Sequence, residues 1–277
     1  MKNQLTRSHS THLPIKRDLS LAYIFSFIIT ALITAASLGG LLFPSVLYPS
    51  DELRQAFLAN DVVNFLVGIP ILLGCMWLTK RGKLIGLLCW PGALLYTFYN
   101  YIAYIFGMPF GWATLLYILL VLLSAYAVFV LVKNTEWDTV KDKLDRKVSE
   151  KFSGGVLVFY GVAFFFLAVG VVTGASADQG TVAMPDIGVA IADLVLSTLL
   201  SIGGILLFQR KPLGYASGMG LLVAASALFI GIILIVLLQP LLTNAPFVLE
   251  DVIVLSGMAL ICFIPTGLFM RGVLSNS

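Results

Sequence analysis

Long apolar runs separated by short polar breaks dominate the chain. They lie at about 20–43, 62–79, 84–106, 112–132, 154–174, 187–208, 213–238 and 250–270. A helix needs about 20 mostly apolar residues to cross a hydrocarbon core of about 30 Å, and each run is close to or above that length. Barrel strands are not expected, because the runs are too long and too continuous, and an open sheet would leave backbone groups unpaired in lipid. The pattern predicts an all-α membrane bundle of eight transmembrane helices.

The run at 84–106 is the least typical of the eight. It contains Pro91, Asn100 and four tyrosines, although apolar segments stand at both of its ends. An alternative is that 62–106 forms one re-entrant hairpin, which would give fewer full crossings.

Composition supports a membrane protein rather than a water-soluble one. The 277 residues are 59% hydrophobic and 11% charged, against about 25% charged in an ordinary soluble domain. The lipid bilayer is therefore the expected partner, and nothing in the composition indicates nucleic acid. The three cysteines lie in apolar runs without a CxxC spacing, so neither a disulfide nor a metal pair is expected.

The distribution of charge predicts the orientation. If the N-terminus is cytoplasmic and every run crosses once, all 17 lysines and arginines except Arg54 fall on the cytoplasmic side. The outer segments instead hold Asp51, Glu52, Asp178, Asp186, Glu250 and Asp251. Because basic residues in short loops are retained in the cytoplasm, this distribution favours eight crossings with both termini cytoplasmic.

The chain divides into four predicted parts. They are a cytoplasmic N-terminal tail at 1–18, a four-span half at 19–132, a cytoplasmic amphipathic connector at 133–152 and a second four-span half at 153–277. In the connector, Trp137, Val140, Leu144 and Val148 recur at helical spacing among charged residues, which predicts a surface helix over 134–151 on the cytoplasmic face of the membrane.

The two halves resemble each other at one turn. The segment at 80–86 and the segment at 209–214 both combine basic residues with a glycine that follows a leucine or isoleucine. Because both halves start on the same side, a duplication would relate two parallel four-helix halves by an axis along the membrane normal. The alternative is that short cytoplasmic turns collect such residues without common origin.

A few polar residues inside the spans are candidates for function, because an ionisable side chain within lipid is costly. Residues three or four apart share a helical face. Four such stripes, one of them the Ser and Thr stripe of the first span, together predict a water-filled cavity that opens outward, with Asp193 as its deepest charge. Its candidate residues are Asp61, Asn64, Tyr96, Asn100, Tyr104, Asp193 and Ser197.

A structural explanation competes with the cavity. Hydroxyl groups commonly join membrane helices, at about 0.6 kcal/mol per hydrogen bond, and this is the preferred reading of the Ser and Thr stripes, including the one that ends at Ser37. Asp61 is expected to cap the start of its helix, where a carboxylate meets the positive end of the helix dipole.

Several function classes lack the residues that they require. No histidine lies in a predicted span, and the chain has no HExxH, P-loop or Rossmann glycine pattern. We therefore expect no catalytic site, no cofactor and no metal. A membrane enzyme acting on lipid or isoprenoid would need a general acid or base, for which only Asp193, Glu250 and Asp251 are available, and is the least favoured class.

One stretch carries a family resemblance. The segments 61–64, 90–93 and 99–110, which include Trp90-Pro91-Gly92 and Tyr99-Asn100-Tyr101, resemble a run found in prokaryotic polytopic integral membrane proteins of no known activity. The resemblance covers about 50 residues and implies a prokaryotic plasma membrane.

The favoured function is that of a small-molecule permease or transporter-like protein. The alternative is a non-enzymatic accessory or sensory membrane protein in which 134–151 binds a cytoplasmic protein.

Overall fold

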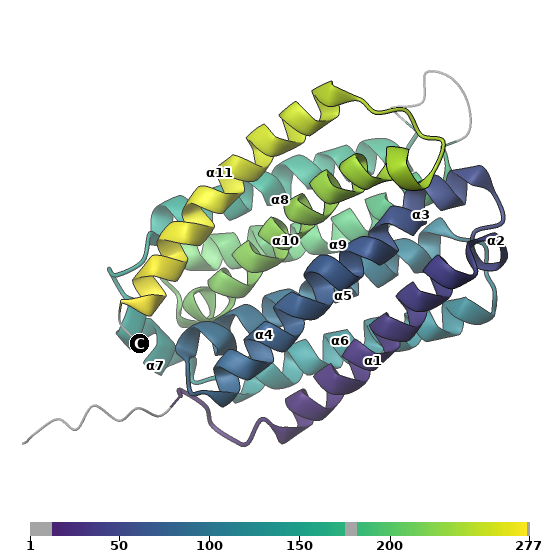
Figure 1. Cartoon of the computed structure of the whole chain (residues 1–277). Coiled ribbons are helices and arrows are strands. Elements are labelled where there is room, and N and C mark those ends of the chain that lie inside the picture. The colour runs from purple at the N-terminus through teal and green to yellow at the C-terminus, as the bar shows by residue number, and fades with distance from the viewer. Residues whose placement is uncertain (1–12, 175–181, 276–277) are drawn as a thin grey trace, which may run out of the picture.

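The computed structural model describes residues 13–174 and 182–275, and the long elements in this part of the chain are helices that run side by side along one direction (Figure 1). Their bounds are α1 Ser20–Leu42, α2 Pro44–Leu47, α3 Asp51–Val63, the π-helical turn η1 Asn64–Gly68, α4 Ile69–Lys80, α5 Leu84–Gly107, α6 Trp112–Asn134, α7 Trp137–Leu144, α8 Glu150–Val172, α9 Met184–Phe208, α10 Pro212–Leu242 and α11 Leu249–Leu274. The predicted all-α class is confirmed.

Seven helices of the described chain are long and apolar enough to cross a membrane. They are α1, the continuous helix Asp51–Lys80 formed by α3, η1 and α4, and α6, α8, α9, α10 and α11. Many of their outward-facing side chains are large and hydrophobic, among them Phe27, Leu122, Phe166 and Ile253. These helices make the chain an integral multi-pass membrane protein.

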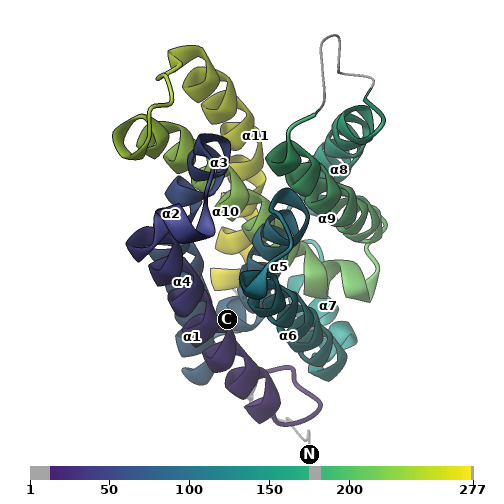
Figure 2. The ribbon, with the colours of Figure 1, turned by 90° about the vertical axis from the view of Figure 1, so that its right-hand side faces the viewer.

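The remaining long helix, α5, lies in the interior of the bundle (Figure 2). It packs against α4, α6, α9 and α10, and most of its 24 residues are buried. A helix surrounded by protein does not need the lipid-facing side chains that a peripheral helix needs. For this reason α5 can carry tyrosines and an asparagine that make it less apolar than its neighbours.

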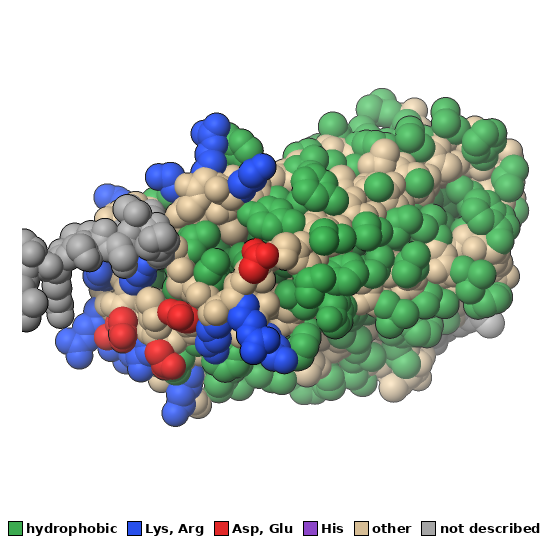
Figure 3. Space-filling view, turned by 90° about the horizontal axis from the view of Figure 1, so that it is seen from below, with side chains coloured by type: hydrophobic (Ala, Val, Ile, Leu, Met, Phe, Trp, Pro, Cys, Tyr) green, Lys and Arg blue, Asp and Glu red, His purple; other side chains and the backbone are tan. Residues whose placement is uncertain are grey.

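The two ends of the bundle differ in charge. At the basic end, defined by the α4–α5 and α9–α10 turns and α7, lie Lys80, Arg81, Lys83, Arg210 and Lys211. Lysines and arginines gather at one end of the face in Figure 3, whereas hydrophobic side chains cover the rest of that face. The opposite end holds α2 and the first turns of α3 and α11, with acidic residues in both of these turns.

The helix that contains Asp61 begins earlier than the sequence pattern predicts. The apolar run was predicted from residue 62, but α3 starts at Asp51, and the Ser50 side chain accepts a hydrogen bond from the Leu53 amide at 3.2 Å as an N-cap. The polar residues before 62 are therefore helical. The prediction failed there because Asp51 and Glu52 are exposed at the end of the bundle, whereas Asn60 and Asp61 are buried in protein, so these residues do not have to face lipid.

A π-helical turn interrupts this long helix three residues after Asp61. In η1 the amide of Ile69 donates to the carbonyl of Asn64, five residues back. Pro70 follows and has no N–H to donate to residue 66, so the regular α-helical pattern cannot be completed there. Such turns are frequent at functional sites.

Close backbone approaches fix α5 and the α8–α9 pair. A Cβ on Gly92 of α5 would overlap the carbonyl oxygen of Gly220 in α10, and a Cβ on Gly154 of α8 would lie 2.7 Å from the carbonyl oxygen of Gly204 in α9. Small residues allow this approach, which membrane helices use in place of a hydrophobic driving force.

The connector departs from the predicted surface helix. Helix α7 ends at Leu144, and α8 begins only at Glu150, after Arg146 adopts a positive φ of 59°. Val140 and Leu144 are fully buried, and α7 packs against α10. The apolar side chains of the connector are thus buried against the protein rather than lying on a membrane surface, because the neighbouring helix α10 covers them.

The predicted division into a tail and two halves stays a prediction. Residues 1–12 of the tail lie outside the described residues, whereas the amide of Lys16 donates to the carbonyl of Asn134 at 2.7 Å. Helices from the two predicted halves interlock, since α5 packs against α9 and α10, and α3 packs against α10.

Candidate functional site

Asp61 lies in the interior of a helix rather than at its start. It stands ten residues after Asp51, about 15 Å along the helix at about 1.5 Å per residue. Its exposed fraction is 1%. The prediction that Asp61 caps its helix is therefore wrong, because Ser50 takes that position when α3 extends to residue 51.

Two tyrosine hydroxyls hold the Asp61 carboxylate. Tyr48, between α2 and α3, donates to Oδ2 at 2.5 Å, and Tyr104 of α5 donates to Oδ1 at 3.0 Å. Burial, and then the charge of Asp61, raise the pKa of Tyr48 well above its ordinary value, so its hydroxyl remains a donor. Among the described residues, no lysine, arginine or histidine forms an ion pair with Asp61.

Two asparagines extend this network across the helices. The Asn60 side-chain amide donates to Oδ1 of Asn100 at 3.1 Å and to the Tyr104 hydroxyl at 3.3 Å. Asn100 in turn donates to the carbonyl of Tyr96 at 3.0 Å. The Tyr96 hydroxyl is buried without a hydrogen-bond partner among the described residues. The structure thus joins the side chains of Asn60, Asp61, Asn100 and Tyr104 in one polar cluster, to which Tyr96 contributes only its backbone carbonyl.

The first span closes the cluster from the other side. Asn64, at the start of η1, donates to the Ser37 hydroxyl of α1 at 3.4 Å. Gly40, one turn further along α1, leaves no room for a side chain, since a Cβ there would overlap Oδ2 of Asp61. The space around the carboxylate is therefore filled by protein atoms on the α1 side.

Aromatic rings pack around the tyrosine hydroxyls. Tyr104 contacts Tyr101 and Tyr117, with ring centroids 5.4 and 5.1 Å away. The Tyr101 hydroxyl is buried and has no hydrogen-bond partner at normal distance among the described residues. We name the set Tyr48, Asn60, Asp61, Asn100 and Tyr104 the Asp61 cluster.

Asp193 and Ser197 lie elsewhere. Asp193 of α9 accepts a hydrogen bond from the Tyr99 hydroxyl at 2.9 Å, and Ser197 donates to the carbonyl of Leu194 in its own helix. Tyr99 and Asn100 are neighbours in α5, about 100° apart around a helix, so they face different partners. The predicted polar residues thus form two groups, and a single water-filled cavity that joins them stays a prediction.

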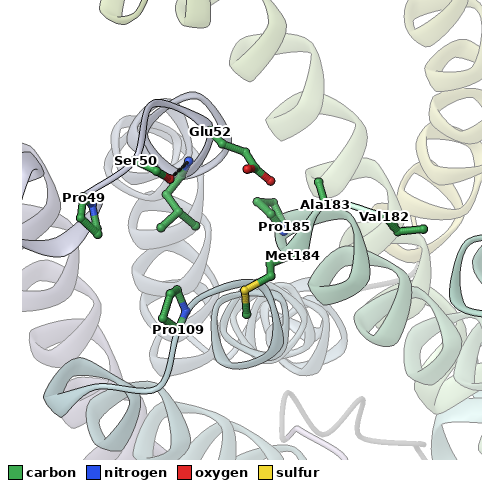
Figure 4. Close-up of a pocket in the computed structure, with 9 residues that line it drawn as sticks. Pro49, Ser50, Glu52, Pro109, Val182, Ala183, Met184 and Pro185 are labelled. Carbon is green, nitrogen blue, oxygen red and sulfur yellow. Dashed lines mark hydrogen bonds between the residues drawn. The ribbon is translucent and has the colours of Figure 1, made fainter. Parts of the chain in front are cut away.

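A surface pocket of about 580 Å³ opens at the end of the bundle opposite the basic end, beyond the Asp61 cluster. Figure 4 places Pro49, Ser50 and Glu52 on one side of it, Met184 and Pro185 on another, and Pro109 below. Glu52 is the charged residue among those that line it. None of the seven predicted cavity residues lines this pocket.

Phe57 lies on α3 between the pocket residue Leu53 and Asp61. Leu53 lines the pocket, and Leu53, Phe57 and Asp61 follow at intervals of four residues on one face of α3. The Phe57 ring packs on the Tyr104 ring at 4.5 Å between centroids. At the end of α5, a Cβ on Gly107 would meet both Phe57 and the pocket residue Pro185, at 3.0 and 3.2 Å.

Sequence reasoning missed three members of this region: Tyr48, Asn60 and Phe57. Tyr48 lies in a short connection, where no helical periodicity marks it. Asn60 directly precedes Asp61, which was already a candidate from the sequence, and this position could have identified it. Phe57 follows the spacing of four that leads to Asp61, but the segment at 51–61 had not been assigned to a helix.

The chemistry of the site is that of an isolated carboxylate with neutral donors. No group of three or more metal-ligating His, Cys, Asp or Glu side chains occurs among the described residues. Comparison with protein-family models, with curated proteins and with solved structures found no match for this chain. The resemblance of 61–110 to prokaryotic membrane proteins therefore stays an expectation.

Proposed function

We propose that the protein is a small-molecule permease with eight membrane crossings, in which the surface pocket admits the substrate and the Asp61 cluster lies on its path. One observation supports this above all: a buried carboxylate without an ion-pair partner in the described chain lies two helical turns below an open pocket. Purely structural helix contacts do not require a carboxylate at such a place, because burying one is costly.

The eighth crossing in this proposal is α5. At about 1.5 Å per residue its 24 residues extend about 36 Å, enough for a hydrocarbon core of about 30 Å. Its central position supplies the reason for its lower hydropathy. A re-entrant hairpin over 62–106 is less well supported, since the two segments belong to helices of 30 and 24 residues.

Cysteine labelling in intact cells tests the topology. In our proposal the basic end faces the cytoplasm of a prokaryotic cell, and the two termini lie there with it. Lys80→Cys then stays unlabelled by a membrane-impermeant maleimide, whereas Phe110→Cys, after α5, is labelled. The three native cysteines are buried and give a low background. Equal labelling of both positions would mean that α5 does not cross.

The lining of the pocket indicates the substrate class. It combines prolines, Leu53, Val182, Ala183 and Met184 with one acidic side chain, Glu52. A volume of about 580 Å³ falls in the range of about 300–1,000 Å³ that is typical of small-molecule sites. We infer a partly apolar small molecule that is neutral or positively charged.

A flux experiment tests the permease. Purified protein in proteoliposomes is assayed for uptake of tetraphenylphosphonium, choline and glycerol. We expect uptake of at least one cation, its loss in Asp61→Asn, and weaker apparent affinity in Glu52→Gln. Glu250→Gln is the matched control, since Glu250 is exposed at the same end but does not line the pocket. If Asp61→Asn leaves every detected flux unchanged, the proposal is wrong.

The alternative of an accessory or sensory protein has less support. The apolar side of the connector packs inside the protein, so only its charged side is free to bind a partner. A charge reversal such as Lys147→Glu tests this alternative better than deletion, which would remove packing against α10.

A further inference from the structure

We propose that Asp61 is a reversible proton-binding site that exchanges protons with the surface pocket, and that Phe57 closes the path between them. This inference rests on the proposed permease, for which it names the coupled ion. It concerns one step: a hydronium ion that enters from the pocket and reaches Asp61 transfers its proton to a carboxylate oxygen and leaves a water molecule behind.

The surroundings of Asp61 favour a proton over a metal cation. Sodium would need several oxygen ligands and space for the ion, but both carboxylate oxygens already accept tyrosine hydroxyls. On the α1 side the contact is so close that not even a methyl group fits at Gly40. A proton needs no such space, and it removes the charge that makes burial of a carboxylate costly.

Among the described residues, the titratable groups that interact electrostatically with Asp61 are tyrosines: Tyr48, Tyr101, Tyr104 and Tyr117. These tyrosines come from the α2–α3 connection, α5 and α6. The residues of α1 that face Asp61 are Ser37 and Gly40, which do not titrate, and α10 has no ionisable side chain near this end. Tyrosine hydroxyls stay neutral at ordinary pH. Asp61 is therefore the one group of the cluster that changes charge.

The hydroxyls can follow this change of charge. A hydroxyl both donates and accepts, so Tyr48 and Tyr104 can donate to the carboxylate and accept from the protonated acid. The Tyr101 hydroxyl is buried beside the Asp61 cluster and has no hydrogen-bond partner at normal distance in the described chain, so it is a further group that can reorient.

Phe57 occupies the path from the pocket. Its exposed fraction is 4%, and it packs against the Tyr104 ring and the last turn of α5 at Gly107. Its position between Leu53 and Asp61 on α3 means that water from the pocket reaches the carboxylate only when the ring moves aside.

Infrared difference spectroscopy on reconstituted protein tests the site. Between acidic and alkaline buffer, wild type is expected to show a titrating carboxylic-acid C=O band that Asp61→Asn lacks and that Asp193→Asn retains. Tyr48→Phe keeps the carboxyl group, removes one bonded hydroxyl and is expected to shift the frequency of the same band. A wild-type spectrum without such a band, or a band that Asp61→Asn retains, would overturn the proposal.

The kinetics of the band test the gate. After a pH jump, Phe57→Ala is expected to protonate several-fold faster than wild type with the same amplitude, whereas Phe229→Ala, a buried control in α10, is expected to keep the wild-type rate. Equal rates in all three proteins would refute the role of Phe57. Loss of the band on addition of sodium chloride at constant pH would identify a cation site instead.

Failure of this inference is distinguishable from failure of the permease. The band is measured without substrate, so it is expected even if no tested compound is transported. Conversely, flux that depends on Asp61 without a titrating band would leave the permease in place and remove the proton.

Discussion

A methyl group added at Gly40 tests how closely α1 packs against the Asp61 cluster. A Cβ there would overlap Oδ2 of Asp61 and lie 2.7 Å from the Tyr48 hydroxyl and 2.8 Å from Cγ of Asp61. Tyr48 is fully buried and Asp61 is 1% exposed, so neither side chain can turn outward. Helix α1 has to shift instead, and we expect Gly40→Ala to cost about 1–3 kcal/mol, the usual range for overpacking.

Gly74→Ala is the matched control. Gly74 lies within α4, and a Cβ there meets nothing within 4 Å. Replacing glycine by alanine stabilises a helix by about 0.5–1 kcal/mol at either position. The difference in stability between the two variants therefore isolates the steric effect. Thermal unfolding of purified protein, followed by tryptophan fluorescence, measures it. About 1–3 kcal/mol corresponds to several degrees, at about 2–4 °C per kcal/mol for a chain of this size.

A double-mutant cycle with Asp61→Ala assigns the effect to the predicted contact. Removing the carboxylate gives the methyl group space, so Gly40→Ala is expected to cost much less in the Asp61→Ala background than in wild type. The reasoning is refuted if Gly40→Ala melts as high as Gly74→Ala, or if its cost is the same in both backgrounds.

Two further predictions concern the packing of α10. Gly92→Ala places a Cβ onto the backbone of Gly220 and is expected to destabilise by about 1–3 kcal/mol or more, because a backbone cannot rotate away as a side chain can; an unchanged melting temperature would contradict this close contact. Tyr215→Phe removes a hydroxyl that donates to Asp145 at 2.8 Å and to Glu150 at 3.0 Å, and is expected to cost about 1.5–3 kcal/mol in the same assay. A variant as stable as wild type would show that these carboxylates find other donors.

The order of apolar residues along the chain was enough to predict a membrane helix bundle. Lipid imposes this regularity, because each span must present apolar side chains and pair its own backbone groups. The same rule explains where the prediction was incomplete. The first turn of α3 is polar and lies at the end of the bundle, and α5 is rich in tyrosine but covered by protein, so neither segment has to present a continuous apolar run to lipid.

The candidate site depended on the tertiary structure. Periodicity placed Asp61 and Asn64 on one stripe and Asn100 and Tyr104 on another, but it could not decide which stripes meet. Tyr48 reaches Asp61 from a connection 13 residues earlier, and Tyr104 reaches it from 43 residues later. Only the packing of helices brings such positions together.

Sequence by itself therefore determined that lipid surrounds this protein and which segments become long helices, because these follow from the local requirement to solvate each segment. Tertiary structure decided that Asp61 is buried among tyrosines below a pocket, whereas Asp193 pairs with Tyr99 on another side of α5. A turn of about 100° between adjacent residues directs them to different neighbours, and the rotation of each helix about its axis is fixed by close contacts such as Gly92 on Gly220.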